Sequence, residues 1–151
     1  MTPTKIIIFE DEFLLATDLK QQIQKHGYEV IALFRKAEEG IHFIRSIREP
    51  EELPEIILMD ISLAGSMNGI EAARILQKEF NFTLVFLTGM SQMNIFEEAF
   101  ETRPHEFLIK PFDIQQALVS IRLAVNRKQI EDELNRCLVE LKKKETDSLP
   151  A

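Results

Sequence analysis

Five polar residues with complementary chemistry each come directly after, or at the end of, a short apolar run. They are two adjacent acids, a third acid, a hydroxyl and an ammonium: Glu10, Asp11, Asp60, Thr88 and Lys110. Three carboxylates placed together repel one another, so at least one pKa rises unless a cation relieves the repulsion. Oxygen ligands suit Mg²⁺, and the three scattered histidines offer no zinc-like set. A carboxylate beside Mg²⁺, with a hydroxyl and an ammonium opposite, is suited to accepting a phosphoryl group.

The elements that must position these residues are five strands alternating with five helices. The apolar runs predict strands at residues 5–9, 28–34, 56–60, 83–88 and 106–109. Apolar periodicity predicts helices at 15–26, 37–47, 69–80 and 91–101, and from residue 113 almost to the end of the chain. This alternation is typical of an α/β fold whose parallel sheet is covered on both faces. The doubly wound, flavodoxin-like strand order 2-1-3-4-5 is expected, which brings the five polar residues to one edge.

The same residues and the sequence around them resemble the receiver domain of two-component response regulators, in particular the chemotaxis regulators. The resemblance is carried by the stretches IIIFEDE, IILMDISLAGSMNGIEAA, VFLTG and FLIKPF, and it covers about residues 4–127. It implies that Asp60 is the phosphoacceptor. It also implies that Mg²⁺ is held by Glu10, Asp11, Asp60 and the backbone carbonyl of Ser62.

The resemblance assigns further roles at the ends of the last two strands. Lys110 is expected to pair with the phosphoryl group, and the peptide bond before Pro111 to be cis. Thr88 is implied as the switch hydroxyl, and Phe107 as the aromatic residue that rotates with it. The implied partners are a sensor histidine kinase or phosphotransfer protein and a downstream protein effector. Such a domain is a signalling phosphoacceptor that catalyses only its own phosphorylation and dephosphorylation, and not an enzyme acting on other substrates.

Three other functions fit parts of the pattern. A phosphohydrolase with an Asp nucleophile usually carries a second Asp two residues later, where this chain has Ser62. A flavodoxin-like FMN site needs small residues in its first loop, and the acids Glu10, Asp11 and Glu12 would repel the phosphate. A receiver that works without phosphorylation remains open from the sequence.

The chain divides into a receiver domain, residues 1–127, and a C-terminal helical extension, residues 128–151, with a frayed end. In the last helix, a first apolar stripe suits packing on the sheet: Ile114, Leu118, Ile121 and Val125. Its continuation would place Lys128 and Asp132 inward, so this stripe is expected to end there. A second stripe has heptad-like spacing: Ile130, Leu134, Cys137 and Leu141. It predicts either a coiled coil, which would make a homodimer or dock a partner, or a solvated charged tail.

Composition limits the classes of partner. The net charge of −7 and the pI near 5.1 argue against nucleic acid as a partner. A single cysteine, Cys137, suits a reducing compartment and is expected to pack as a small apolar residue. No apolar run approaches the roughly 20 residues that cross a bilayer, so no membrane association and a cytoplasmic location are expected.

Overall fold

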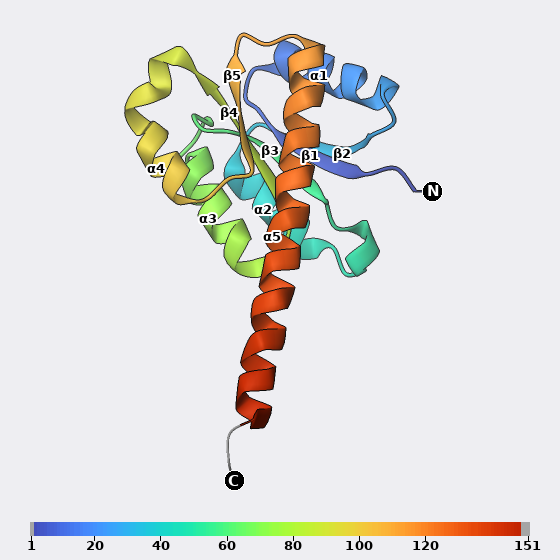
Figure 1. Ribbon diagram of the computed structural model, residues 1–151. Helices are drawn as coiled ribbons and strands as arrows, with labels where there is room; N and C mark the ends of the chain where they lie inside the picture. Colours follow the sequence, from blue (N-terminus) through green and yellow to red (C-terminus); the bar gives the residue numbers. More distant parts are fainter. Residues whose placement is uncertain (1, 149–151) are drawn as a thin grey trace.

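A five-stranded parallel sheet forms the centre of the molecule (Figure 1). The computed structural model describes residues 2–148, the side chains of residues 92 and 93 excepted. The strand order β2-β1-β3-β4-β5 confirms the doubly wound, flavodoxin-like prediction. The strands are β1 (Lys5–Phe9), β2 (Glu29–Phe34), β3 (Ile56–Asp60), β4 (Thr83–Gly89) and β5 (Glu106–Lys110).

Helices cover both faces of this sheet, which is why its central strands are apolar on both sides. One face packs against α1 (Phe13–Lys25) and α5 (Ile114–Ser148). The other packs against α2 (Ala37–Ser46), α3 (Gly69–Glu79) and α4 (Phe96–Glu101). Successive strand residues alternate between the faces: Ile6 and Ile8 point to the first core, and Ile7 and Phe9 to the second. Two short 3₁₀ helices, η1 (Pro50–Glu52) and η2 (Met90–Ile95), complete the elements.

The helix predicted at residues 91–101 is wrong in its first half. Residues Met90–Ile95 form the 3₁₀ helix η2, and the α-helix occupies only Phe96–Glu101. Ala99 is the only buried side chain of α4 among the described residues. Because short helices depend on packing an apolar face, so little buried surface does not sustain a longer α-helix here.

The loop after β3 is fixed in place by the first residues of α3. The Asn68 side chain accepts a hydrogen bond from the Glu71 amide at 2.9 Å and so caps the helix. The Gly69 amide donates to the Ile61 carbonyl at 2.8 Å. A Cβ at Gly69 would lie 2.0 Å from the carbonyl oxygen of Asp60, so only glycine permits this approach. The start of α3 therefore holds the backbone that carries the Asp60 carboxylate.

Helix α5 packs on the sheet through smaller residues than the sequence predicts. Its buried residues are Ala117, Ile121 and Ala124, with Ile114 and Val125 partly buried beside them. Leu118, which was predicted to point inward, is only half-buried, and the small residues Ala117 and Ala124 are fully buried against the sheet. Figure 1 shows α5 continuing well past the body of the domain as one helix. Among the described residues, no helix is both long enough and apolar enough to cross a bilayer.

Polar contacts hold α5 to the body beyond its apolar packing. Lys128 does lie inward, where its Nζ donates to Asn81 Oδ1 at 2.6 Å and to Asp132 Oδ1 at 2.7 Å. Buried His105 accepts a hydrogen bond at Nδ1 from the Leu84 amide, at 3.0 Å. Its Nε2 therefore carries the proton and donates to Glu131 Oε2 at 2.5 Å. The inward face thus changes from apolar to polar, and it does not end at residue 127.

Candidate functional site

The sheet brings the five polar residues predicted from the sequence to one edge. Asp60 is the last residue of β3, and Glu10 follows directly after β1, the neighbour of β3 on one side. On the other side, β4 carries Thr88 near its end, and the next strand, β5, ends at Lys110. Because the strands are parallel, all of these ends point the same way, as expected from the sequence.

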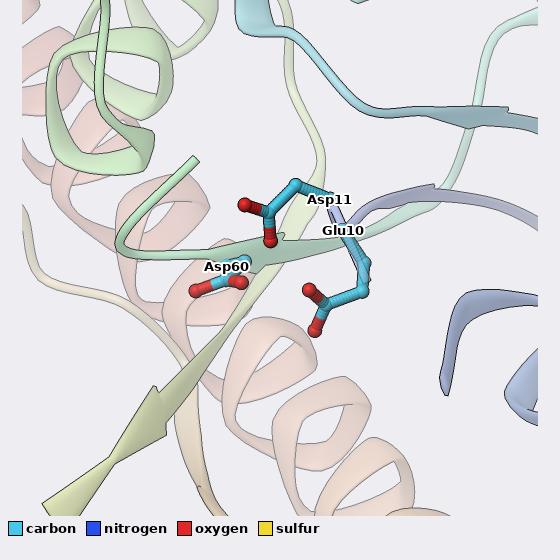
Figure 2. A group of neighbouring side chains, drawn as sticks. All are labelled: Glu10, Asp11 and Asp60. Carbon is cyan, nitrogen blue, oxygen red and sulfur yellow. The ribbon is translucent and has the colours of Figure 1, made fainter. Parts of the chain in front are cut away.

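Three acids from two neighbouring strands form the centre of the site. Oxygen atoms of Glu10, Asp11 and Asp60 all lie within 4.8 Å of one another. Figure 2 shows the three carboxylates gathered where β1 and β3 end. Asp60 and Glu10 are buried, with exposed fractions of 1% and 2%, whereas Asp11 is half-buried. One side of the cluster therefore meets solvent, and the other is enclosed by the sheet.

The ammonium of Lys110 bridges the two buried acids. Its Nζ donates to Asp60 Oδ2 at 3.1 Å and lies 2.5 Å from Glu10 Oε1. The other Asp60 oxygen, Oδ1, accepts a hydrogen bond from the Ser62 amide at 3.0 Å. The Asp60 carboxylate is therefore held at both oxygens. The Lys110–Pro111 peptide bond, directly after this lysine, is cis.

Crowding of the acids perturbs the site electrostatically. Burial, together with the adjacent Asp60 carboxylate, raises the pKa of Glu10 to about 7, although Lys110 opposes the shift. Burial also acts to lower the pKa of Lys110, but its hydrogen bonds and its attraction to Glu10 and Asp60 outweigh that effect, and the pKa is raised. Lys110 is therefore a permanent cation, and Glu10 is a carboxylate that gains a proton near neutral pH.

The two carboxylate oxygens of Glu10 differ in their hydrogen bonding. Oε1 accepts no hydrogen bond of good geometry among the described residues, although Lys110 lies close to it. Glu10 Oε2 accepts a hydrogen bond from the Glu12 amide at 3.1 Å. A hard divalent cation suits a set of three carboxylates with one such under-coordinated oxygen. The donor set therefore fits Mg²⁺.

Thr88 and Phe107 lie on the adjacent strands β4 and β5. Thr88 is 1% exposed, and its hydroxyl donates to the Gly89 carbonyl at 3.3 Å. Phe107 is half-buried, with its ring centroid 4.4 Å from that of Phe96 and 5.8 Å from that of Phe86. The Phe107 ring therefore packs between the sheet and the outer helix α4.

Two sets of contacts are not predicted from the sequence: the aromatic rings near Phe107, and those of His105, which precedes β5 at the end of the strand opposite Lys110. Phe96 and Phe100 of α4 stack near Phe107, with ring centroids 6.2 Å apart. An apolar residue every four positions predicts a helix face, but not which strand residue it meets. In the sequence His105 is one of three scattered histidines, whereas in the structure it is buried and bonded to Glu131. No sequence signal identifies that pair, because its members are 26 residues apart on separate elements.

Comparison with known proteins finds similar sequences and similar folds. The family model of the response regulator receiver domain matches residues 6–122. The transcriptional regulatory protein PdtaR of Mycobacterium tuberculosis is 29% identical over 125 residues, which are 83% of this chain and 58% of that protein. The chain therefore spans well under two thirds of that relative.

Two further relatives are covered almost completely. The chemotaxis protein CheY of Listeria monocytogenes is 26% identical over 80% of this chain and 97% of its own length. The crystal structure of the signal receiver domain of a modulated diguanylate cyclase from Desulfovibrio desulfuricans superposes with a TM-score of 0.75. It is 30% identical, and the match covers 85% of this chain and 98% of that one.

Proposed function

Because the chain belongs to the response regulator receiver domain family, we propose that it is a switch set by phosphorylation of Asp60. One observation carries the proposal: the buried Asp60 carboxylate lies between an acid cluster and a lysine, at the carboxyl end of the central strand. That combination places a nucleophile, a cation site and a fixed positive charge around one point. The receiver unit is taken as residues 1–127, with residues 128–151 as a helical extension. Residues 149–151 of that extension lie outside the described residues.

In the proposed reaction, an Asp60 oxygen attacks the phosphorus of a phosphohistidine on a sensor kinase or phosphotransfer protein. A P–O bond forms to Asp60, the P–N bond to the histidine breaks, and the imidazole leaves with the electron pair of that bond. The Ser62 amide and Lys110 orient the carboxylate before attack, since they bind its two separate oxygens. The Lys110 ammonium then offsets negative charge on the transferred group.

Glu10, Asp11, Asp60 and the Ser62 carbonyl are the groups that would hold Mg²⁺. The three carboxylates fit such an ion by their oxygen chemistry and mutual distances. When bound, Mg²⁺ supplies positive charge that lowers repulsion between the acids and the incoming phosphoryl group. Glu10 and Asp11 contribute by keeping that charge beside Asp60.

We expect the affinity for Mg²⁺ to fall as the pH drops below about 7, because Glu10 takes up a proton there. The raised pKa means that, below pH 7, a cation must displace a proton from Glu10, whereas above it the carboxylate is already free. Calorimetric titration with Mg²⁺ about one pH unit above and one below this value checks the expectation. Glu10→Gln should bind Mg²⁺ more weakly, with a flatter pH profile. Equal affinity of the wild type at the two pH values would contradict the expectation.

The proposed signal passes from Asp60 to the surface through Thr88 and Phe107. Phosphorylation replaces the single negative charge of the Asp60 carboxylate by a phosphoryl group that carries up to about two, beside the buried Thr88 hydroxyl. If that hydroxyl moves toward the phosphoryl group, it vacates space next to the Phe107 ring. Phe107 also contacts Phe96 on α4, so its rotation would alter a face that a downstream protein effector can bind. The output proposed is thus a change in protein binding.

The location of the phosphoryl group tests this function. Purified protein is treated with a small phosphodonor and Mg²⁺, and then with borohydride, which reduces an aspartyl phosphate to homoserine. Mass spectrometry of the peptide that contains Asp60 should show this conversion at Asp60. Conversion at another acid, or none while the protein is otherwise folded, would overturn the assignment.

A further inference from the structure

The outward side of α5 carries a regular row of exposed residues. Their spacing is 4-3-4-4-3-4, and we refer to them as the outer stripe: Val119, Leu123, Asn126, Ile130, Leu134, Cys137 and Leu141. All seven are exposed, and Val119, Ile130, Leu134 and Leu141 have exposed fractions between 55% and 62%. Aliphatic residues in such a row cost free energy when they remain in water. The stripe is therefore a surface without an intramolecular partner among the described residues.

The outer stripe repeats every 11 residues. Val119, Ile130 and Leu141 occupy equivalent positions, as do Leu123 with Leu134 and Asn126 with Cys137. An 11-residue repeat gives 3.67 residues per turn, close to the 3.6 of a straight α-helix, so the row stays on one side of the helix. From residue 119 to residue 141 it is about 33 Å long, at 1.5 Å per residue. The second stripe predicted from the sequence, from Ile130 to Leu141, is thus part of a longer repeat that begins within the receiver.

Contacts with the body fix the direction in which this stripe faces. Ala117, Ile121 and Ala124 are buried against the sheet on the opposite side of the helix. Further along, Lys128 and Glu131 bond to Asn81 and His105 of the body. The helix is therefore held along its inner side past the point where its apolar packing ends, and the outer stripe is presented outward as a rigid row.

We propose that the outer stripe is the seam of a parallel, in-register homodimer of this chain. The polar residue Asn126 selects the occupant and the direction. In a parallel two-fold pair, Asn126 of each copy faces Asn126 of the other, and the two amides hydrogen-bond to each other, as a single buried asparagine does in dimeric coiled coils. In an antiparallel pair centred on Ile130, the same side chain would face Leu134 and remain unsatisfied.

The size of the stripe suits a stable pair. Two copies of the seven side chains present on the order of 1,300 Å² of accessible surface, within the ~1,200–2,000 Å² buried by standard interfaces. Burial of the longer aliphatic side chains provides the association free energy, and Asn126 provides the register. These side chains are Leu123, Ile130, Leu134 and Leu141. This inference does not depend on the proposed function, since no residue of the stripe belongs to the acid cluster.

Sedimentation equilibrium of the whole chain over a wide concentration range tests the dimer. The wild type and Asp60→Asn should both reach twice the monomer mass, whereas Leu134→Glu should stay monomeric. Leu134 is 59% exposed, so this change leaves the monomer fold intact. Val139→Glu is the matched control, because Val139 is 66% exposed and lies two residues from Cys137, on the other side of the helix. A monomeric wild type, or equal loss of the dimer in both glutamate variants, would overturn the proposal.

Oxidative cross-linking tests the register, since Cys137 is the only cysteine of the chain. In the parallel pair the two Cys137 side chains face each other, so mild oxidation should give a disulfide-linked dimer. A variant with Cys137→Ser and Val139→Cys should give far less. If the wild type is a dimer but does not cross-link, the parallel register is wrong, because an antiparallel pair places Cys137 opposite Leu123.

Discussion

Replacing Lys110 by methionine should lower the free energy of unfolding by about 3 kcal/mol at mildly alkaline pH without divalent cations. The reason is that Glu10 and Asp60, whose side chains are 0% and 2% exposed, would lose the cation between them. Methionine keeps the apolar stem of lysine, so the change isolates the charge. Urea denaturation in the presence of EDTA measures the effect.

The pH dependence of this effect follows from the two pKa shifts. The pKa of Lys110 is raised, so its ion pairs persist throughout the neutral and mildly alkaline range. Glu10 has a pKa of about 7 and is neutral below it, which removes one of the two charges that need a counter-ion. Lys110 acts to lower the pKa of Glu10, so the variant, which lacks this cation, takes up a proton on Glu10 at a higher pH than wild type does. The stability difference between wild type and Lys110→Met should therefore shrink as the pH falls toward 7 and level off below it.

The control for this prediction is Lys143→Met, which removes an exposed lysine of α5. Exposed charges of this kind contribute little to stability, so the control should match the wild type. Added Mg²⁺ should partly restore Lys110→Met, because it supplies charge at the same acids. A Lys110→Met protein as stable as wild type at alkaline pH would show that the lysine does not neutralise this cluster.

Replacing Asp11 by asparagine should weaken Mg²⁺ binding by roughly 100-fold or more, since even groups that only orient a metal ligand account for about 10–100-fold. Asp11 is the half-buried acid of the cluster, so the change removes the negative charge of a proposed ligand without leaving a buried charge unpaired. Stability without metal should stay the same or increase, because repulsion within the cluster falls. Calorimetric titration with Mg²⁺ and urea denaturation measure the two quantities.

Glu12→Gln is the matched control for Asp11. Glu12 is the next acid in the sequence and is exposed, and it lies outside the cluster. The Glu12→Gln variant should therefore bind Mg²⁺ nearly as tightly as the wild type does. If both variants lose affinity equally, the effect arises from general negative charge, and the three-acid site is not the place where the ion binds.

The sequence predicts the sheet and its polar edge well because both depend on short, strong local signals. Runs such as Ile56–Met59 are apolar throughout, as strands buried on both faces must be. Each run ends in a residue of distinct chemistry, and parallel strand order alone brings those ends together. The positions of Asp60 and Lys110 follow from this rule, without knowledge of any single contact.

The remaining features depend on packing that local patterns do not contain. Phe96–Glu101 is shorter than predicted because α4 buries only Ala99 among the described residues. Helix α5 buries Ala117 and Ala124, which the predicted stripe does not include, since the distance between helix and sheet selects side-chain size. Cys137 was expected to pack within the chain, but it is exposed. The inward position of Lys128 becomes favourable only because Asn81, distant in sequence, is there to bind it.

The central claim is that Asp60 accepts a phosphoryl group with the help of its neighbours. The most direct measurement is the intact mass of the protein after incubation with acetyl phosphate and Mg²⁺, for wild type and for Asp60→Asn. Asparagine has nearly the same shape, but it lacks the nucleophilic carboxylate. We expect wild type to gain the mass of one phosphoryl group and Asp60→Asn to gain none. No gain in wild type, or an equal gain in both proteins, would contradict the claim.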